Sequence, residues 1–185
     1  MNKNTEQSSI SIIAAGFGGQ GILFAGKQLA LAGMYLEKQV TWLPSYGPES
    51  RGGTSNCTVI ISDEEIGSPV TKNPDILMVM NTPSYVKFHD SIAKGGYLIC
   101  NSSLISEKSN RDDINKYYIP ATAIAYENDM PKLANVIMLG KLISATHIFT
   151  PNELIMSMEK TIAKSKRDLL EANIKALNIG YEYSE

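Results

Sequence analysis

Cysteine and histidine are scarce in this sequence, which contains two of each among its 185 residues. A protein-bound iron–sulfur cluster usually needs four cysteines, and a structural zinc site needs a set of cysteine and histidine ligands. The chain is therefore not expected to hold either centre by itself. Cys57 and Cys100 lie in or beside apolar runs, which predicts small buried side chains. His89, in a helix of surface type, and His147 have no carboxylate or nucleophile that the sequence places beside them, so neither is expected to be catalytic.

Charged residues are also few, at 19% of the chain, whereas hydrophobic residues make up 43%. This composition is globular, and its low charge indicates surface that is buried in a larger assembly. The formal net charge of -2 provides no basic face for nucleic acid or an anionic membrane, so we expect neither partner. The length suits one domain with a sizeable core.

Long apolar runs are absent too, since no segment approaches the roughly 20 apolar residues that span a bilayer. The first nine residues are polar and lack the pattern of a secretory signal. We therefore expect a cytoplasmic protein without a membrane span. Residues 1–9 are expected to form a disordered tail, and residues 10–185 a single domain.

A glycine-rich run follows the first apolar segment of the chain. Residues 10–13 read as a buried strand, and residues 22–36 read as a long apolar helix. Between them Gly16, Gly18 and Gly21 fit the pattern G-x-G-x-x-G. This pattern gives a tight turn, backbone amides close to a ligand, and a helix N-terminus directed at negative charge.

The usual ligand of this pattern, a dinucleotide, requires an acidic residue about 20 residues further on, at the end of the second strand. That strand is expected at 39–43, and Pro44 and Ser45 follow it in place of an acid. An ordinary dinucleotide site is therefore disfavoured. The glycines serve either another anionic ligand or only the packing of the helix on the sheet.

A long polar loop is expected at 44–56. Compact domains rarely keep so long a connection without a use for it. Its glycines let backbone amides approach a ligand closely, and Arg51 offers a permanently charged fork of donors for phosphate or carboxylate. The composition indicates an anion-binding loop, and the alternative is a plain surface loop in which Arg51 pairs with Glu49.

Strand and helix signals alternate along the rest of the chain. Further strands are expected at 57–61, 75–80, 97–101 and 116–119, and further helices at 133–149 and 165–177. Thr82 is expected to cap one helix, and Thr150 with Glu153 has the form of a capping box. The sequence predicts an α/β fold, a single Rossmann-like domain with a mostly parallel sheet flanked by helices and a helical C-terminal third.

Three stretches taken together resemble the gamma subunit of 2-oxoacid:ferredoxin or acceptor oxidoreductases. They are the glycine run at 16–21, the loop motif Pro-Ser-Tyr-Gly-Pro-Glu-Ser-Arg-Gly-Gly at 44–53, and Asn135 with the pair Leu139 and Gly140. The likeness covers nearly the whole chain after the tail. The form of the loop motif is most similar to that of the 2-oxoglutarate enzymes.

This resemblance implies a subunit of an enzyme that is inactive when isolated, with neither a catalytic residue nor a metal of its own. The family oxidatively decarboxylates a 2-oxoacid with coenzyme A, here 2-oxoglutarate to succinyl-CoA and carbon dioxide, and reduces ferredoxin or another low-potential acceptor. The implied partners are alpha, beta and ferredoxin-like delta subunits. These partners would hold thiamine diphosphate, its magnesium ion and the iron–sulfur clusters.

The expected cofactor-binding residues lie in the glycine turn and the polar loop: Gly16, Gly18, Gly19, Gln20, Gly21, Ser45, Tyr46, Arg51, Gly52, Gly53 and Thr54. We expect them to form one concave surface, either for coenzyme A or for closing the thiamine site of a neighbouring subunit. Within the same family, the chain could instead belong to a complex for pyruvate or for a branched-chain 2-oxoacid. Outside the family, the alternatives are a free-standing nucleotide-binding domain and a purely structural subunit.

Overall fold

The computed structural model describes residues 9–46 and 54–184. Their elements follow in the order β1 (Ser9–Phe17), α1 (Ile22–Tyr35), β2 (Gln39–Tyr46), β3 (Thr54–Ser62), β4 (Ile76–Val79), α2 (Thr82–Phe88), η1 (His89–Ser91), β5 (Tyr97–Asn101), β6 (Asn115–Ile119), α3 (Ala121–Glu127), α4 (Ala134–Thr146), α5 (Pro151–Thr161), η2 (Lys164–Lys166) and α6 (Arg167–Glu182). β1 begins at the last residue of the expected tail, whose other residues, 1–8, lie outside the described part. Within the described ranges, no helix is both long and apolar enough to cross a bilayer.

Six strands form one sheet in the order β2-β3-β1-β4-β5-β6. The pairs β1–β4, β4–β5 and β5–β6 are parallel, whereas β3 runs antiparallel to both β1 and β2. Five of these six strands therefore run in one direction and β3 runs in the other. The predicted α/β fold with a mostly parallel sheet and a helical C-terminal part is confirmed.

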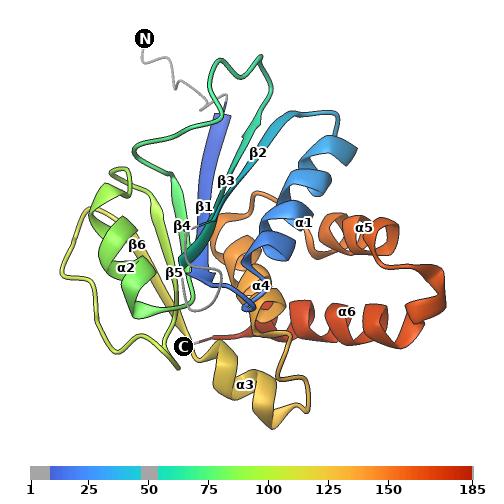
Figure 1. Cartoon of the computed structure of the whole chain (residues 1–185). Coiled ribbons are helices and arrows are strands. Elements are labelled where there is room, and N and C mark those ends of the chain that lie inside the picture. Colours follow the sequence, from blue (N-terminus) through green and yellow to red (C-terminus); the bar gives the residue numbers. More distant parts are fainter. Residues whose placement is uncertain (1–8, 47–53, 185) are drawn as a thin grey trace.

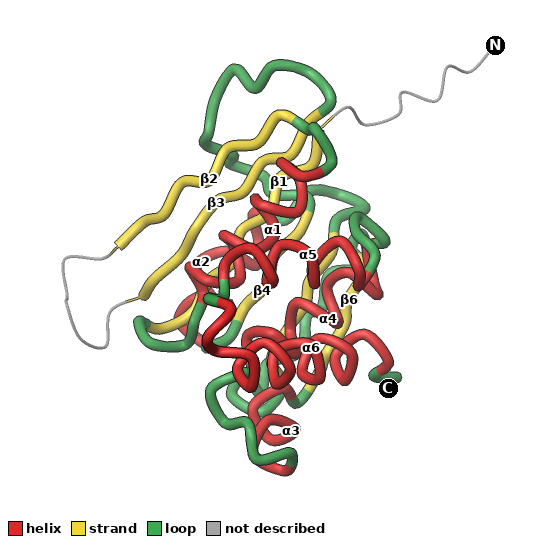
Figure 2. The backbone as a smooth tube through the Cα atoms, turned by 90° about the vertical axis from the view of Figure 1, so that its right-hand side faces the viewer, coloured by secondary structure: helices red, strands yellow, loops and turns green. Residues whose placement is uncertain are grey.

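Helices cover the two faces of the sheet unequally (Figures 1 and 2). α1, α4, α5 and α6 form a thick layer on one face, where α1 packs on β1, β2 and β3 and α4 contacts β5 and β6. α2 lies on the other face against β1 and β4, and the β5–β6 connection packs beside it through Ile105 and Ile114. α5 covers the outer side of α1. The nearly all-round apolar sequence of α1 follows from this double cover.

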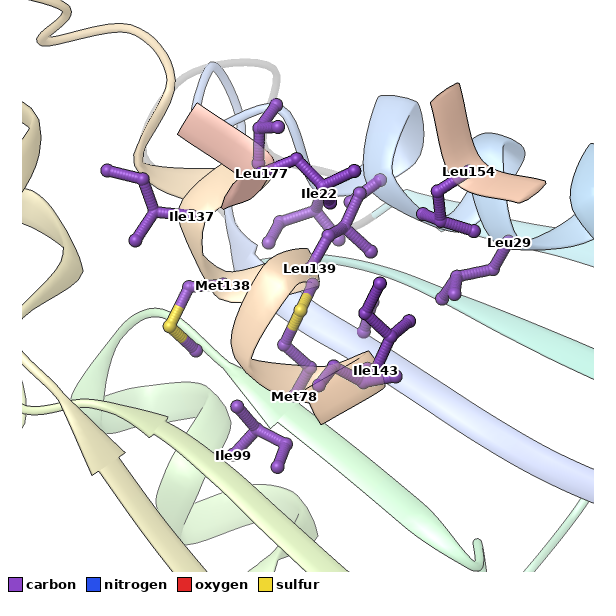
Figure 3. Close-up of a cluster of buried hydrophobic side chains, with 14 of the residues drawn as sticks. Ile22, Leu29, Met78, Ile99, Ile137, Met138, Leu139, Ile143, Leu154 and Leu177 are labelled. Carbon is purple, nitrogen blue, oxygen red and sulfur yellow. The ribbon is translucent and has the colours of Figure 1, made fainter. Parts of the chain in front are cut away.

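Most of the buried apolar side chains gather between the sheet and the thick helical layer (Figure 3). The close-up shows Met78 of β4 and Ile99 of β5 below the side chains of α4, with Ile22 and Leu29 of α1 beside them. All four side chains are at most 2% exposed. Each fully buried side chain of this size contributes about 1.5–3 kcal/mol to folding, so this layer is the main source of stability.

α4 is buried along ten consecutive residues, 134–143, because α6 covers its outer face. The two helix backbones approach closely at two glycines. A Cβ atom on Gly140 would lie 2.1 Å from the carbonyl oxygen of Leu177, and one on Gly180 would lie 1.9 Å from that of Ile137. Gly140 inside the expected helix therefore marks a close backbone contact, which explains a residue of low helix propensity at this position.

β2 is longer than predicted, because Pro44, Ser45 and Tyr46 continue the strand instead of opening the loop. A proline is tolerated there because β2 is an edge strand, whose outer side needs no ladder donors. The expected loop at 44–56 is therefore shorter at both ends, and Thr54 already belongs to β3.

The cap of α2 also differs from the prediction. Asn81, rather than Thr82, is the N-cap residue, and its Oδ1 accepts a hydrogen bond of 2.8 Å from the backbone N–H of Ser84. Asparagine and threonine are both good N-cap residues, and the sequence offers them side by side. The capping box of α5 is present as predicted, with Thr150 and Glu153 bonding reciprocally.

Candidate functional site

The ends of β1 and β2 and the start of β3 meet at one edge of the sheet. Phe17 at the end of β1 pairs with Thr54, and Gly16 pairs with Ser55. Ser55 also pairs with Tyr46 at the end of β2. The predicted site residues Gly16, Ser45, Tyr46 and Thr54 therefore share this edge, while Arg51, Gly52 and Gly53 lie outside the described residues.

The glycine turn joins β1 to α1 at the same edge. Gly19 has φ = 93° and Gly21 has φ = 74°, a left-handed conformation that favours glycine. Gly18 and Gly19 are exposed, and beyond their chain neighbours no atom of the described residues lies within 4 Å of where their Cβ atoms would be. The turn thus offers uncovered backbone to its surroundings.

Gln20 fastens the turn to two strands. Its Oε1 accepts a hydrogen bond of 2.6 Å from the backbone N–H of Phe17, and its Nε2 donates to the carbonyl oxygen of Met80 at 3.3 Å. A Cβ on Gly16 would lie 2.7 Å from this Oε1, so Gly16 makes room for the side chain. The Gln20 side chain therefore connects the end of β1 to the end of β4.

The N-terminus of α1 begins at Gly21, without a side-chain cap and without an acidic residue in its first turn. The N–H groups of such a turn have no partner within the helix and favour negative charge. Asn135 of α4 lies beside it: its Nδ2 donates to the carbonyl oxygen of Gly21 at 3.1 Å. The Oδ1 of the same side chain is buried and has no hydrogen-bond partner within the described structure.

A groove of about 200 Å³ opens beside the turn, between the ends of β1 and β4. α1 follows β1 on one face of the sheet and α2 follows β4 on the other, so the groove lies at the point where the chain changes faces (Figure 1). Open α/β sheets bind their ligands in this crevice. The groove is lined by Gly19, Gln20, Met80, Leu104, Thr122, Tyr126, Pro131, Lys132 and Ala134.

The electrostatics of the groove favour an anion. Lys132 contributes a cation, and none of the described residues that line the groove is acidic. The N-terminus of α1 begins next to the groove. In the described ranges no three His, Cys, Asp or Glu side chains come together as metal ligands. The arrangement suits a phosphate or a carboxylate that is bound by backbone amides, hydroxyls and one ammonium group.

A family model described as pyruvate ferredoxin/flavodoxin oxidoreductase matches residues 11–183. The chain belongs to this family.

Two relatives illustrate its place within the pyruvate ferredoxin/flavodoxin oxidoreductases. It is 40% identical to the 2-oxoglutarate synthase subunit KorC of Methanocaldococcus jannaschii, over 100% of this chain and 99% of that one. It is 34% identical to the ketoisovalerate oxidoreductase subunit VorA of Methanothermobacter thermautotrophicus, over 97% of this chain but 37% of that one. The same unit therefore occurs in the family both as a separate chain and as part of a longer one.

Solved structures agree with the family assignment. The gamma subunit of keto/oxoacid ferredoxin oxidoreductase from Geobacter sulfurreducens is 27% identical, with a TM-score of 0.78 over 94% of this chain and 96% of that one. A 2-oxoglutarate:ferredoxin oxidoreductase chain from Magnetococcus marinus, 23% identical, shares the fold with a TM-score of 0.84 over 95% of this chain and 31% of that one. The predicted recognition of a gamma subunit is thus confirmed.

In this gamma subunit, the groove residues other than the glycine turn were missed from the sequence. Met80 follows β4, while Thr122, Tyr126 and Lys132 come from α3 and the segment after it. A partial signal was available, since residues that follow parallel strands gather at the carboxyl edge of a sheet. Lys132 carries no local signal, and only the fold brings it beside the glycine turn.

His89 was expected on the surface, but it is 7% exposed. Its Nδ1 lies 2.8 Å from Oδ1 of the adjacent Asp90. Its Nε2 lies 2.7 Å from Ser109 Oγ, because the β5–β6 connection folds back over η1. This line of Ser, His and Asp lacks the other parts of an acyl-transfer site. The Asp90 side chain is 94% exposed, and the N–H of Ser109, a possible oxyanion donor, donates to Tyr118 Oη instead. The group fastens the connection to α2.

The two cysteines are buried, as predicted, and the structure has both as free thiols. Burial raises the pKa of the Cys57 thiol to about 11 and that of the Cys100 thiol to about 12. Thiols with such pKa values are protonated and unreactive at neutral pH. Neither is a nucleophile of this gamma subunit.

Proposed function

We propose that this chain is the gamma subunit of a 2-oxoglutarate:ferredoxin oxidoreductase. The complex would decarboxylate 2-oxoglutarate oxidatively with coenzyme A, giving succinyl-CoA, carbon dioxide and a reduced ferredoxin-like acceptor. The observation that carries the proposal is the 40% identity to a 2-oxoglutarate synthase subunit over the full length of both chains. The loop motif at 44–53 supports the same substrate.

The part of this chain in the reaction would be to hold coenzyme A beside the active site of a partner subunit. The site would comprise the glycine turn, the groove next to it, and the polar loop with Arg51. The diphosphate of coenzyme A suits the N-terminus of α1, and Lys132 offers a second positive contact.

The other cofactors of the reaction would belong to partner subunits. Thiamine diphosphate is held through a metal that needs oxygen ligands, and the clusters need cysteine thiolates. The described residues of this chain offer no such group of ligands, and the two cysteines of the sequence are each buried within a strand. The proposed partners are the alpha, beta and ferredoxin-like delta subunits that the family resemblance implies.

The test of the substrate is a purification of the tagged chain from its own cell with everything that accompanies it. Activity is measured as coenzyme A-dependent reduction of a viologen dye with 2-oxoglutarate, pyruvate and ketoisovalerate in turn. We expect larger partner chains and the highest kcat/KM with 2-oxoglutarate. A preference for ketoisovalerate or pyruvate would move the chain to another branch of its family.

The test of the coenzyme A site compares two substitutions at the proposed site with one control substitution, all in the assembled complex. A charge-assisted hydrogen bond contributes about 1.5–3 kcal/mol, so Lys132→Gln and Arg51→Ala should each raise the KM for coenzyme A roughly tenfold or more. Lys94→Gln, on the opposite side of the sheet, is the matched control and should leave this KM unchanged. Unchanged kinetics in the first two variants would favour a structural role for these residues.

A free-standing nucleotide-binding domain is the other candidate function. It would account for the glycine turn, but the end of β2 has no acidic residue for a ribose. That function requires the isolated chain to gain thermal stability from a nucleotide. Thermal unfolding with NAD, FAD, ATP and coenzyme A distinguishes the two, since coenzyme A alone should act under our proposal.

A further inference from the structure

A second groove lies far from the glycine turn, between α5 and α6. It has a volume of about 450 Å³ and is lined by Glu159, Lys160, Ile162, Ala163, Lys164, Arg167 and Leu170. In Figure 1 the connection between these helices lies at the right, at the side of the helical layer remote from the sheet. None of these lining residues belongs to the coenzyme A site proposed above.

Positive charge is concentrated around this groove. The eight residues 160–167 include Lys160, Lys164, Lys166 and Arg167 and no acidic residue, although the whole chain has a net charge of -2. All four side chains are exposed. The nearby acids are Glu159, Asp168 and Glu171, and the Arg167–Glu171 ion pair of 3.0 Å lies in solvent, where such pairs are weak.

The floor of the groove is apolar, in contrast to its rim. Ile162 is 9% exposed and packs in the main core, with Leu170 partly buried beside that core. Ala163 adds a small exposed side chain at the opening. An apolar floor inside a lysine-rich rim matches a partner surface with one or two apolar side chains surrounded by carboxylates.

We propose that this groove is a docking surface for the small acidic protein that accepts the electrons of the complex. The inference rests on the proposed function, which requires such an acceptor. Lysine-rich exposed rims suit transient encounters, because charge steers association and leaves the complex able to separate. Permanent subunit interfaces are larger and more apolar, and their cores are depleted of lysine.

The main experiment reverses two charges at the rim. Lys164→Glu with Arg167→Glu changes exposed positions only, and glutamate in the first turn of α6 is compatible with the helix. In the assembled complex we expect the KM for a purified ferredoxin to rise roughly tenfold at low ionic strength and to lose most of its salt dependence. Viologen reduction, which needs no docking protein, should not change.

The matched control is Lys72→Glu with Lys94→Glu, which changes the net charge equally at exposed positions outside the lining of the groove. It should leave the KM for ferredoxin within about twofold of the starting value. A second variant, Ala163→Trp, fills the groove without changing any charge. It should raise the KM roughly threefold and keep the original salt dependence.

Three results would overturn the docking surface. One is an unchanged ferredoxin KM in the charge-reversed complex, and another is loss of a subunit from that complex during gel filtration, which would assign the groove to a permanent partner. The third is charge-dependent binding to phosphatidylserine vesicles with an unchanged ferredoxin KM. Titration of ferredoxin into the same complexes measures Kd without turnover, so docking is tested even if the complex does not oxidise 2-oxoacids.

Discussion

Asn135 of α4 donates a hydrogen bond of 3.1 Å from its Nδ2 to the carbonyl oxygen of Gly21, the N-cap residue of α1. The two residues are 114 positions apart in the sequence. A Cβ on Gly21 would lie 2.5 Å from the same Nδ2, so the contact also requires glycine at the turn. The position of the α1 N-terminus thus depends on α4.

Asn135→Ala should therefore affect both stability and ligand binding. Loss of the bond leaves the Gly21 carbonyl without its donor, which costs about 1–2 kcal/mol in the free energy of unfolding. The KM for coenzyme A should rise as well, because the turn loses its support. Urea unfolding and steady-state kinetics measure the two effects, and Asn128→Ala, which removes a bond within α3, should change stability alone.

The close approach of α4 and α6 predicts a large effect of one methyl group. Gly140→Ala places a Cβ against the backbone of α6 and should destabilise the fold by about 3 kcal/mol, in spite of the better helix propensity of alanine. Thermal unfolding of the variant measures the loss. Gly67→Ala, at a position with open space around it, should change the melting temperature little. Equal melting temperatures for the two variants would contradict the close packing.

The buried thiols predict how stability depends on alkaline pH. The pKa of each thiol is raised in the folded chain, to about 11 for Cys57 and about 12 for Cys100, from an ordinary value of 9.0. Because unfolding restores the lower pKa, the stability from these protonated thiols is complete below pH 9 and is lost as the pH rises toward the folded values. The double variant Cys57→Ala with Cys100→Ala should show a smaller fall in unfolding free energy over this interval.

Thiol labelling provides an independent measurement of the same property. Folded protein at pH 8 should react with a disulfide reagent only as fast as it unfolds, whereas protein in urea should react at once. Rapid labelling of the folded chain would show that at least one thiol is accessible.

The capping box of α5 predicts a smaller effect. Thr150 Oγ1 accepts from the N–H of Glu153, and Glu153 Oε2 accepts from the N–H of Thr150 at 2.7 Å. Thr150→Ala should cost about 1 kcal/mol of unfolding free energy, whereas Thr150→Ser keeps the acceptor and should cost much less. Similar losses in both variants would indicate that the cap contributes little.

Local patterns predicted the elements of the fold well. The apolar runs at 75–80 and 97–101 became β4 and β5 because strands buried on both faces have no polar alternation. The capping box of Thr150 could also be predicted, because its two partners are only three residues apart in the sequence. Asn81 and Thr82 show the limit of such patterns. Both residue types cap helices well, so only the exact path of the chain decides which of the two is the N-cap residue.

Long-range arrangement was less predictable. β3 pairs antiparallel with both β1 and β2, and no local pattern in the sequence predicted this direction. The groove beside the glycine turn is lined by both Gly19 and Lys132, which are far apart in the sequence and share the groove only through the fold. The hydrogen bonds of Gln20 to the backbone of Phe17 and Met80 were likewise not predicted, although Gln20 itself was among the residues expected at the site.

The burial of α4 has a consequence for biosynthesis. α4 lies between the sheet and α6, yet α6 leaves the ribosome more than 20 residues later, after α5 has been made. Until then one side of α4 has no cover and displays apolar side chains and the bare backbone at Gly140. A nascent chain that stops before residue 167 should therefore be bound by chaperones or aggregate.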